Sequence, residues 1–345
     1  MKVSRRMSIV AAALAVVLLA GLAALVGSST SRASTQANKA TFTAALVSDI
    51  GKFNDRSFNQ SQKEGLIRAQ KKLHVKTKAL QSNSTSDYIP NLTQAVRLHA
   101  NLIIAAGFLL ADATNTVAKK YPKIHFAITD YDAKTAPFNG RKNVMGLTYA
   151  ANESGCLVGV LAAKMAQKAG KKIIGAVGGL KIPPVDIWIA GYKFCAQKAV
   201  PGTQVLVDYS QDFVREAKCK ELALNHIAAG SQVEFADAGA CGLGVHDAAR
   251  EHGVWSLGGD ADQSYLGPEI LSSELKKVDV AVYDLIRRVQ NGAFRGGRDT
   301  FYSVQNGGVG IGKISPKVPQ SIDARLQAVK ARLAAGKIKD IPTAP

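Results

Sequence analysis

The sequence predicts an α/β protein with two lobes, each built on a doubly wound parallel sheet. The chain has 345 residues, which is too long for one simple core. Its hydrophobic fraction is 47% and its aromatic fraction 6%, and small aliphatic residues of this kind are typical of parallel strands buried under helices. Strand and helix patterns alternate from residue 41 onward in two successive runs. Together these features favour two consecutive sheets rather than one.

The first run predicts a parallel sheet, because each predicted strand is followed by a helix. Apolar stretches predict strands at residues 42–48, 75–81, 102–106 and 124–129. Asp55 precedes a predicted helix whose apolar positions follow the helical period; they are Phe58, Leu66, Ala69 and Leu73. Further helices are predicted at 86–99 and 114–120.

The second run repeats the same alternation over the rest of the chain. Strands are predicted at 144–148, 172–177, 203–209, 233–237, 254–258 and 307–313. Helices are predicted at 153–168, 184–199, 214–229, 243–252, 275–290 and 321–335. Ligands of such sheets bind beyond the carboxyl ends of the strands, so the loops at those ends are the places to seek a site.

Residues 1–37 have the pattern of a targeting segment. Lys2, Arg5 and Arg6 precede an apolar stretch at 9–26, and a Ser/Thr-rich region follows. The stretch has 18 residues, which is near the minimum for a membrane span, so a cleaved signal peptide and an uncleaved anchor both stay open. We therefore expect an exported protein of the cell envelope. No cysteine follows the stretch, which excludes lipid attachment there.

The four cysteines lie in one continuous part of the chain, at positions 156, 195, 219 and 241. Export permits disulfides, and the spacing is unlike that of metal-binding cysteines, so we expect no metal site. We favour the pairs Cys156–Cys195 and Cys219–Cys241. The alternative is four small buried core residues.

The net charge of +18 raises the question of a nucleic-acid partner. The Lys and Arg residues are scattered over many predicted helices, without a basic run interleaved with aromatics. We therefore expect no nucleic-acid binding, and a basic surface facing an anionic envelope explains the charge better.

The loop 49–59 has the densest group of polar side chains, with Asp49, Asn54, Asp55 and Asn59 beside the ring of Phe58. Carboxylates and amides in this position can bind hydroxyl groups or the edges of a base. Helix capping by one residue is the simpler explanation, but capping does not require so many polar groups. The loop therefore predicts a ligand contact.

Three further residues are candidates for the same site. Trp188 stands at the start of a predicted helix and can stack on a flat ligand or pack in the core. Asp260 and Asp262 follow a predicted strand and can accept hydrogen bonds from hydroxyls. We expect no catalytic residue: the sequence 273–276 matches S-x-x-K by itself, without the companion motifs of serine acyl-enzymes. His246 is expected on the surface.

Four segments of the chain, in order, resemble the motifs of the basic membrane protein family, the purine-nucleoside-binding group of ABC-transporter lipoproteins. They are residues 55–65, 178–192, 239–245 and 259–263, and the resemblance extends over about 41–315. It implies a type I periplasmic-binding-protein-like fold whose lobes are joined by a three-strand hinge. The first lobe would then comprise 41–147 plus 272–300, and the second 148–271 plus 301–340.

The resemblance also implies a purine nucleoside in the cleft, with its base between aromatic rings and its ribose bound by Asp and Lys. The matching positions add Asp130, Gly239 and Lys276 to the candidates above. The implied partners are ABC permease and ATPase subunits, with no cofactor. The chain departs from the family pattern in three features, namely the missing lipid-attachment cysteine, the tryptophan at 188 and the four cysteines.

Other functions of the same fold stay open at this point. A ligand sensor or surface protein would use the cleft without a transporter, and a sugar could replace the nucleoside. An enzyme is not expected, because no nucleophile–base pair stands out in the sequence.

Overall fold

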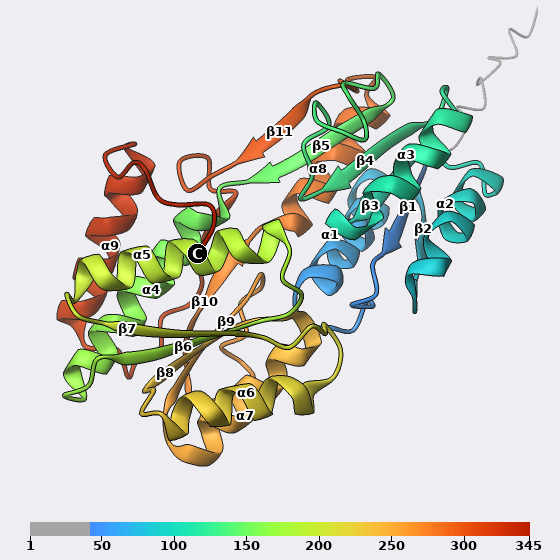
Figure 1. Cartoon of the computed structure of the whole chain (residues 1–345). Coiled ribbons are helices and arrows are strands. Elements are labelled where there is room, and N and C mark those ends of the chain that lie inside the picture. The colour runs from blue at the N-terminus through green and yellow to red at the C-terminus, as the bar shows by residue number, and fades with distance from the viewer. Residues whose placement is uncertain (1–41) are drawn as a thin grey trace, which may run out of the picture. The chain divides into compact units, whose positions relative to one another are not determined.

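The computed structural model describes residues 42–345, so the predicted signal peptide or anchor lies outside the described residues. Two six-stranded sheets form the centres of two lobes (Figure 1). Among the described residues, no helix combines the length and apolar character needed to cross a membrane.

The first sheet has the strand order β11-β5-β4-β3-β1-β2 and is parallel throughout. Its strands are β1 (Thr43–Ser48), β2 (Lys76–Leu80), β3 (Leu102–Ala106), β4 (His125–Thr129), β5 (Val144–Tyr149) and β11 (Asp299–Tyr302). Helices α1 (Phe58–Leu73) and α8 (Val278–Gln290) cover one face, and α2 (Tyr88–Arg97) and α3 (Ala111–Lys120) cover the other. Both faces are apolar because alternate residues of β1 and β3 point to opposite sides.

The second sheet has the order β12-β10-β9-β8-β6-β7, in which only β12 runs antiparallel to its neighbour. Its strands are β6 (Ile173–Gly178), β7 (Gln204–Tyr209), β8 (Val233–Asp237), β9 (Trp255–Gly258), β10 (Ile270–Lys276) and β12 (Val309–Ile311). Helices α6 (Glu216–Ala228) and α7 (Leu243–His252) lie on one face. Helices α4 (Ala151–Lys168), α5 (Pro183–Ala199) and α9 (Gln320–Ala334) lie on the other (Figure 1).

Two disulfides link helices within the second lobe, and both predicted pairs are confirmed. Cys156–Cys195 joins α4 to α5 with the Cα atoms 4.9 Å apart. Cys219–Cys241 joins α6 to the 3-10 turn η3 (Gly239–Gly242) with the Cα atoms 5.5 Å apart. Because a cross-link restricts the unfolded chain, each is expected to stabilise this lobe.

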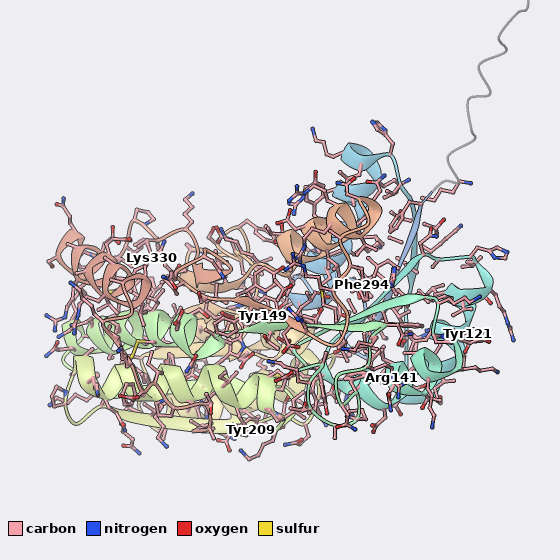
Figure 2. All side chains as sticks on the ribbon, turned by 90° about the horizontal axis from the view of Figure 1, so that it is seen from above. Tyr121, Arg141, Tyr149, Tyr209, Phe294 and Lys330 are labelled. Atoms are coloured by element: carbon pink, nitrogen blue, oxygen red, sulfur yellow. A yellow bond between two sulfur atoms is a disulfide. The ribbon has the colours of Figure 1, made fainter. Side chains whose placement is uncertain are left out.

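The chain passes between the two sheets three times, after β5, after β10 and between β11 and β12. Tyr149 at the end of β5 stacks on Tyr302 at the end of β11, with ring centroids 4.9 Å apart. Figure 2 shows Tyr149 where the two lobes meet. Three adjacent connections of this kind allow the lobes to rotate against each other.

The sheets correct the expected lobe boundaries. We assigned 272–300 to the first lobe, but β10 (Ile270–Lys276) belongs to the second sheet, so the chain crosses after Lys276. Likewise β5 and β11 keep 148–149 and 301–302 in the first sheet.

Two strands were not predicted. The pattern at 275–290 favoured one helix, but its first residues belong to β10 and α8 begins at Val278. The charged Glu274 and Lys276 are both buried in this strand, which hides the apolar signature of a central strand. Strand β11 has only four residues and is partly exposed at the edge of its sheet, so its sequence carries no strong signal.

Candidate functional site

A cavity lies between the lobes at the carboxyl ends of the strands, and nine of the predicted residues line it. They are Asp49, Asp55, Phe58, Asn59, Asp130, Trp188, Gly239, Asp260 and Lys276. The first lobe supplies Asp49 after β1 and Asp130 after β4, whereas the second supplies Asp260 after β9. The site is therefore shared by both lobes.

Asp55 caps the first helix. For this residue alone of the loop 49–59, the alternative explanation of helix capping is confirmed. Its carboxylate accepts hydrogen bonds from the backbone N–H groups of Ser57 at 3.0 Å, Asn59 at 2.8 Å and Gln60 at 2.9 Å. These groups have no partner inside α1, and the positive end of the helix dipole favours the acid. Burial nevertheless raises the pKa of Asp55 to about 6.

Asp49 is fixed with its carboxylate facing the cavity. Its Oδ1 accepts hydrogen bonds from the N–H of Gly51 at 2.8 Å and from Nδ2 of Asn59 at 2.7 Å. Burial raises the pKa of Asp49 to about 7, although these two hydrogen bonds oppose the shift. This carboxyl can therefore donate as well as accept a hydrogen bond near neutral pH.

Lys276 is the centre of charge in the cavity and is only 4% exposed. Its Nζ donates to Oδ2 of Asp130 at 2.9 Å and lies 3.6 Å from Oδ1 of Asp260. Burial alone would lower the pKa of Lys276, but the charges of Asp130 and Asp260 raise it above its ordinary value. The ammonium also lies 4.9 Å from the ring centroids of Phe58 and Trp188, close enough for cation–π attraction.

The two carboxylates beside Lys276 come from equivalent places in the two lobes. Asp130 follows β4 and Asp260 follows β9, and each of these strands is third in the spatial order of its sheet. Both residues have a left-handed backbone, with φ of 61° at Asp130 and 62° at Asp260. Asp tolerates this region better than most residues, but the conformation is sparsely populated. The turn directs each carboxylate inward at the point where the lobes face each other.

Nine of the lining residues were not among the predicted site residues, and two of these nine bear directly on ligand binding. Asp237 ends β8 and lines the cavity, and its Oδ2 is buried without a hydrogen-bond partner among the described residues. Burial, aided by the charge of Asp260, raises the pKa of Asp237 well above its usual range. Its position at the carboxyl end of a strand was the available signal.

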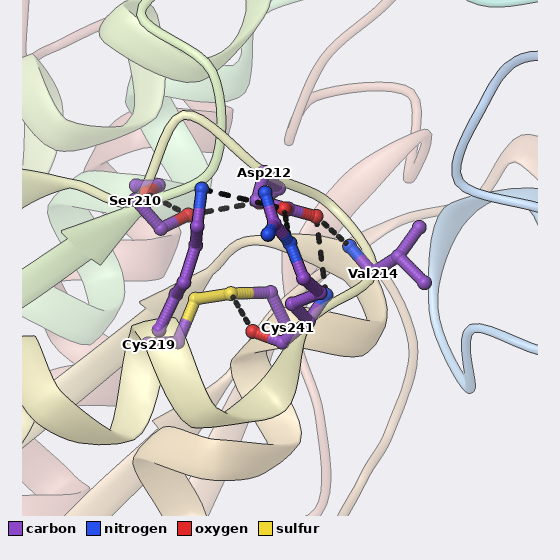
Figure 3. Close-up of a disulfide and its surroundings, with 8 residues drawn as sticks. Ser210, Asp212, Val214, Cys219 and Cys241 are labelled. Carbon is purple, nitrogen blue, oxygen red and sulfur yellow. Dashed lines mark hydrogen bonds and ion pairs between the residues drawn. A yellow bond between two sulfur atoms is a disulfide. The ribbon is translucent and has the colours of Figure 1, made fainter. Parts of the chain in front are cut away.

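Phe213 is the second missed residue, and it lies in the loop after β7. The side chain of Asp212 holds this loop by accepting hydrogen bonds from the N–H of Val214 at 2.8 Å and of Arg215 at 3.1 Å. The carbonyl of Phe213 accepts from the N–H of Cys241 at 3.1 Å, next to the disulfide seen in Figure 3. Cys241, which is fixed by the disulfide, thus helps to hold the loop of Phe213 at the cavity. No local sequence pattern indicates this contact.

Hydrogen bonds across the cleft join the start of α1 to the loop after β9. Ser57 Oγ lies 3.1 Å from the carbonyl of Gly259 and 2.8 Å from Oδ2 of Asp260. Gln263 donates from Nε2 to the carbonyl of Arg56 at 3.1 Å. These contacts hold the two lobes together in the described conformation.

His246 is buried rather than exposed, which corrects our expectation. Its Nε2–H donates to Oε1 of Gln263 at 3.1 Å, and its Nδ1 accepts from Ser256 at 2.9 Å. Burial lowers the pKa of His246, so it stays neutral and fits these two roles. The imidazole therefore orients the amide of Gln263 toward Arg56 of the other lobe.

Two candidates lie outside the cavity, and we no longer assign them a ligand contact. Asn54 is exposed in the turn before α1. Asp262 is also exposed, and its carboxylate accepts from the N–H groups of Ser264 at 3.0 Å and Lys313 at 3.2 Å. Asp262 therefore serves the backbone of its own turn and of a distant segment, a role that a sequence pattern does not distinguish from ligand binding.

Trp188 lines the cavity but is 1% exposed, so most of its ring packs in the core. Within residues 42–345, no group of three or more His, Cys, Asp or Glu side chains is arranged to hold a metal ion.

Residues 42–341 match a family model described as Bmp, ABC transporter substrate-binding protein PnrA-like. The chain belongs to this family. The predicted resemblance and the predicted fold class are therefore confirmed.

Several relatives are similar over most of their length. The chain is 35% identical to an ABC transporter nucleoside-binding protein, BmpA, of Lactococcus lactis, covering 87% of this chain and 90% of the relative. It is 34% identical to a CD4+ T-cell-stimulating antigen of Listeria monocytogenes, covering 88% and 89%. An uncharacterized lipoprotein of Pyrococcus horikoshii is 32% identical, with 86% and 73% covered.

Solved structures agree with the two-lobed fold. A solute-binding protein of an ABC transporter system from Aeropyrum pernix superposes with a TM-score of 0.78 at 26% identity, covering 87% of this chain and 94% of that one. A solute-binding protein from Conexibacter woesei gives a TM-score of 0.70 at 22% identity, with 88% and 100% covered, and supports the fold alone.

Proposed function

We propose that the cleft binds a nucleoside whose base is a purine. At the outer face of the cytoplasmic membrane, the protein would deliver this nucleoside to an ABC transporter made of permease and ATPase subunits. The observation that carries the proposal is the pairing of two aromatic rings, Phe58 from the first lobe and Phe213 from the second, with a buried cluster of carboxylates around Lys276. The name of the Lactococcus lactis relative supports the nucleoside, and the relatives named as lipoproteins support an envelope location.

The flat base would lie between Phe58 and Phe213. An aromatic ring from each lobe gives the base a stacking surface only when the lobes are closed. Two glycines keep room for these rings: a Cβ on Gly107 would lie 3.2 Å from the Phe58 ring, and one on Gly179 would collide with the ring of Phe213. Trp188 also lines the cavity, and its ring stays a second proposed stacking surface.

The ribose hydroxyls would bind Lys276 and the carboxylates of Asp130 and Asp260. A charged donor between two charged acceptors matches vicinal hydroxyls, which both donate and accept. Burial raises the pKa values of Asp49 and Asp237 and so favours protonated carboxyls, which would donate to a ring nitrogen or carbonyl of the base. These roles require binding and orientation only, so we propose no catalytic step.

Titration calorimetry with inosine, guanosine, adenosine, cytidine and free ribose tests the proposal. We expect nucleosides to bind and ribose to bind far more weakly, because ribose lacks the stacking surface. Small-angle scattering with and without the nucleoside should show closure of the lobes. The proposal fails if no nucleoside binds at millimolar concentration while a free sugar or amino acid does.

A further inference from the structure

A groove in the second lobe lies away from the cleft, between α4, α5, α9 and the segment after α9. It measures about 290 Å³. In Figure 2, Lys330 marks α9 at the end of this lobe that is remote from the first lobe.

The floor of the groove is apolar. Val160 and the Cys156–Cys195 disulfide belong to α4 and α5, and Val329 and Ile338 come from α9 and the segment after it. Arg325, Val329 and Arg332 stand four and three residues apart, so they share one face of α9. This places an apolar side chain between two guanidinium groups.

The rim is cationic without a counterion. Lys198, Arg325, Arg332, Lys337 and Lys339 line the groove, and no carboxylate of the described residues lines it with them. None of the five forms an ion pair within the described part of the chain, although Lys198 lies 4.2 Å from the ring centroid of Phe194. Some helix cations elsewhere are ion-paired, for example Arg68 with Asp279 and Lys220 with Glu251.

The concentration of positive charge extends to a neighbouring residue of α4. Burial and the nearby charge of Arg325 together lower the pKa of Lys164. Like charges held together in this way repel one another, and an anion in the groove would relieve the repulsion. The electrostatic complement of this surface is therefore a negatively charged group.

The lining also restricts the rest of the ligand. It contains no neutral hydrogen-bonding side chain, no Ser, Thr, Asn or Gln, among the described residues, so it offers little to the amides of a peptide. A small inorganic anion would leave the apolar floor exposed to water. An alkyl chain with an anionic head satisfies both parts of the surface.

We propose that this groove binds a single-chain anionic amphiphile, with its alkyl chain on the floor and its head between Arg325 and Arg332. Arginine is suited to this role because its planar guanidinium binds carboxylate or phosphate through two hydrogen bonds. The site is independent of the cleft, since the two share no lining residue.

Calorimetric titration of the full chain with decanoate below its micellar concentration tests the proposal, with acetate, decanol and an oligoglutamate peptide as comparison ligands. We expect one decanoate per chain, with an affinity that falls as salt is added. Acetate, decanol and the peptide should each bind at least ten-fold more weakly. The double variant Arg325→Gln/Arg332→Gln should lose at least ten-fold in decanoate affinity.

The matched control is Arg97→Gln/Arg287→Gln, which removes the same charge from exposed helix positions of the first lobe. It should bind decanoate like the wild type, and thermal unfolding should show both variants folded. The proposal is overturned if acetate or decanol equals decanoate, if the peptide binds more tightly, or if the two double variants behave alike. Equal behaviour would place the binding elsewhere, for example on the apolar stretch 9–26.

Discussion

The central cleft and the groove behind α9 are opposite in charge. Of residues 42–345, five carboxylates and one cation line the cleft, whereas five cations and no carboxylate line the groove. In the cleft the groups are mostly buried, and burial raises the pKa of Asp49, Asp130 and Asp237. In the groove the cations stay exposed, where water and salt screen their repulsion. The two sites thus accommodate unbalanced charge differently, because burial favours the protonated form of the acids in the cleft whereas water hydrates the exposed cations of the groove.

Removing the one cation of the cleft is the most severe test of this comparison. Lys276→Met leaves Asp130 and Asp260 without their partner, and breaking a buried pair from one side costs about 3–5 kcal/mol. We expect urea unfolding at pH 7.5 to show a loss of this order, and a smaller loss at pH 5, because burial raises the pKa of Asp130 and so favours its uptake of a proton. Nucleoside affinity should fall by about a hundred-fold or more.

Lys277→Met is the matched control, because Lys277 is adjacent in sequence but exposed. It should leave both stability and affinity within the range of ordinary surface substitutions. A Lys276→Met protein as stable as this control at both pH values would show that the cleft does not depend on its central charge.

Phe213 tests the stacking that we propose for the base. Phe213→Ala should weaken nucleoside binding about ten-fold or more, because base–aromatic stacking is worth about 1–3 kcal/mol per base, and should leave ribose binding unchanged. Calorimetry with inosine and ribose measures both. Phe301→Ala is the control, since Phe301 is 57% exposed on β11. An equal effect of Phe213→Ala on ribose would contradict the stacking role.

The buried acids of the cleft should make stability depend on pH. The folded-state pKa of Asp49 is raised from 3.8 to about 7, so the folded protein holds a proton that the unfolded chain releases between these values. The free energy of unfolding should therefore fall as pH rises from about 4 to 7. Asp49→Asn keeps an acceptor oxygen and should reduce this fall by about 1–3 kcal/mol. Unfolding at pH 4.5 and 7.5 tests it, and an unchanged slope in the variant would refute it.

The smallest expected effect concerns the contact between the lobes. Gln263→Ala removes the hydrogen bond to Arg56 across the cleft, together with the bonds to His246 and Gly259 within the second lobe, and should weaken nucleoside binding by about three- to ten-fold. Gln290→Ala removes a similar bond, to the carbonyl of Leu73 within the first lobe, and serves as the control. Equal affinities of the two variants would show that the contact does not hold the lobes closed.

The sequence predicts the alternating elements, the two lobes and the strand-end loops, because buried parallel strands and amphipathic helices have clear periodicities. It does not reveal β10, because the charged residues Glu274 and Lys276 are buried in this strand and interrupt its apolar pattern. Phe213 is also not predictable, because a disulfide and Asp212 bring its loop to the cavity. Asn54 and Asp262 were assigned to the site from their residue type and their place in strand-end loops, but the structure leaves both exposed and outside the cavity.

Mass spectrometry of the small molecule carried through native purification tests the nucleoside cleft most directly. We predict that a purine nucleoside is released from the wild-type protein at up to one per chain and is absent from Lys276→Met. A sugar or an amino acid released from the wild type, or a nucleoside retained equally by the variant, would contradict this account of the cleft.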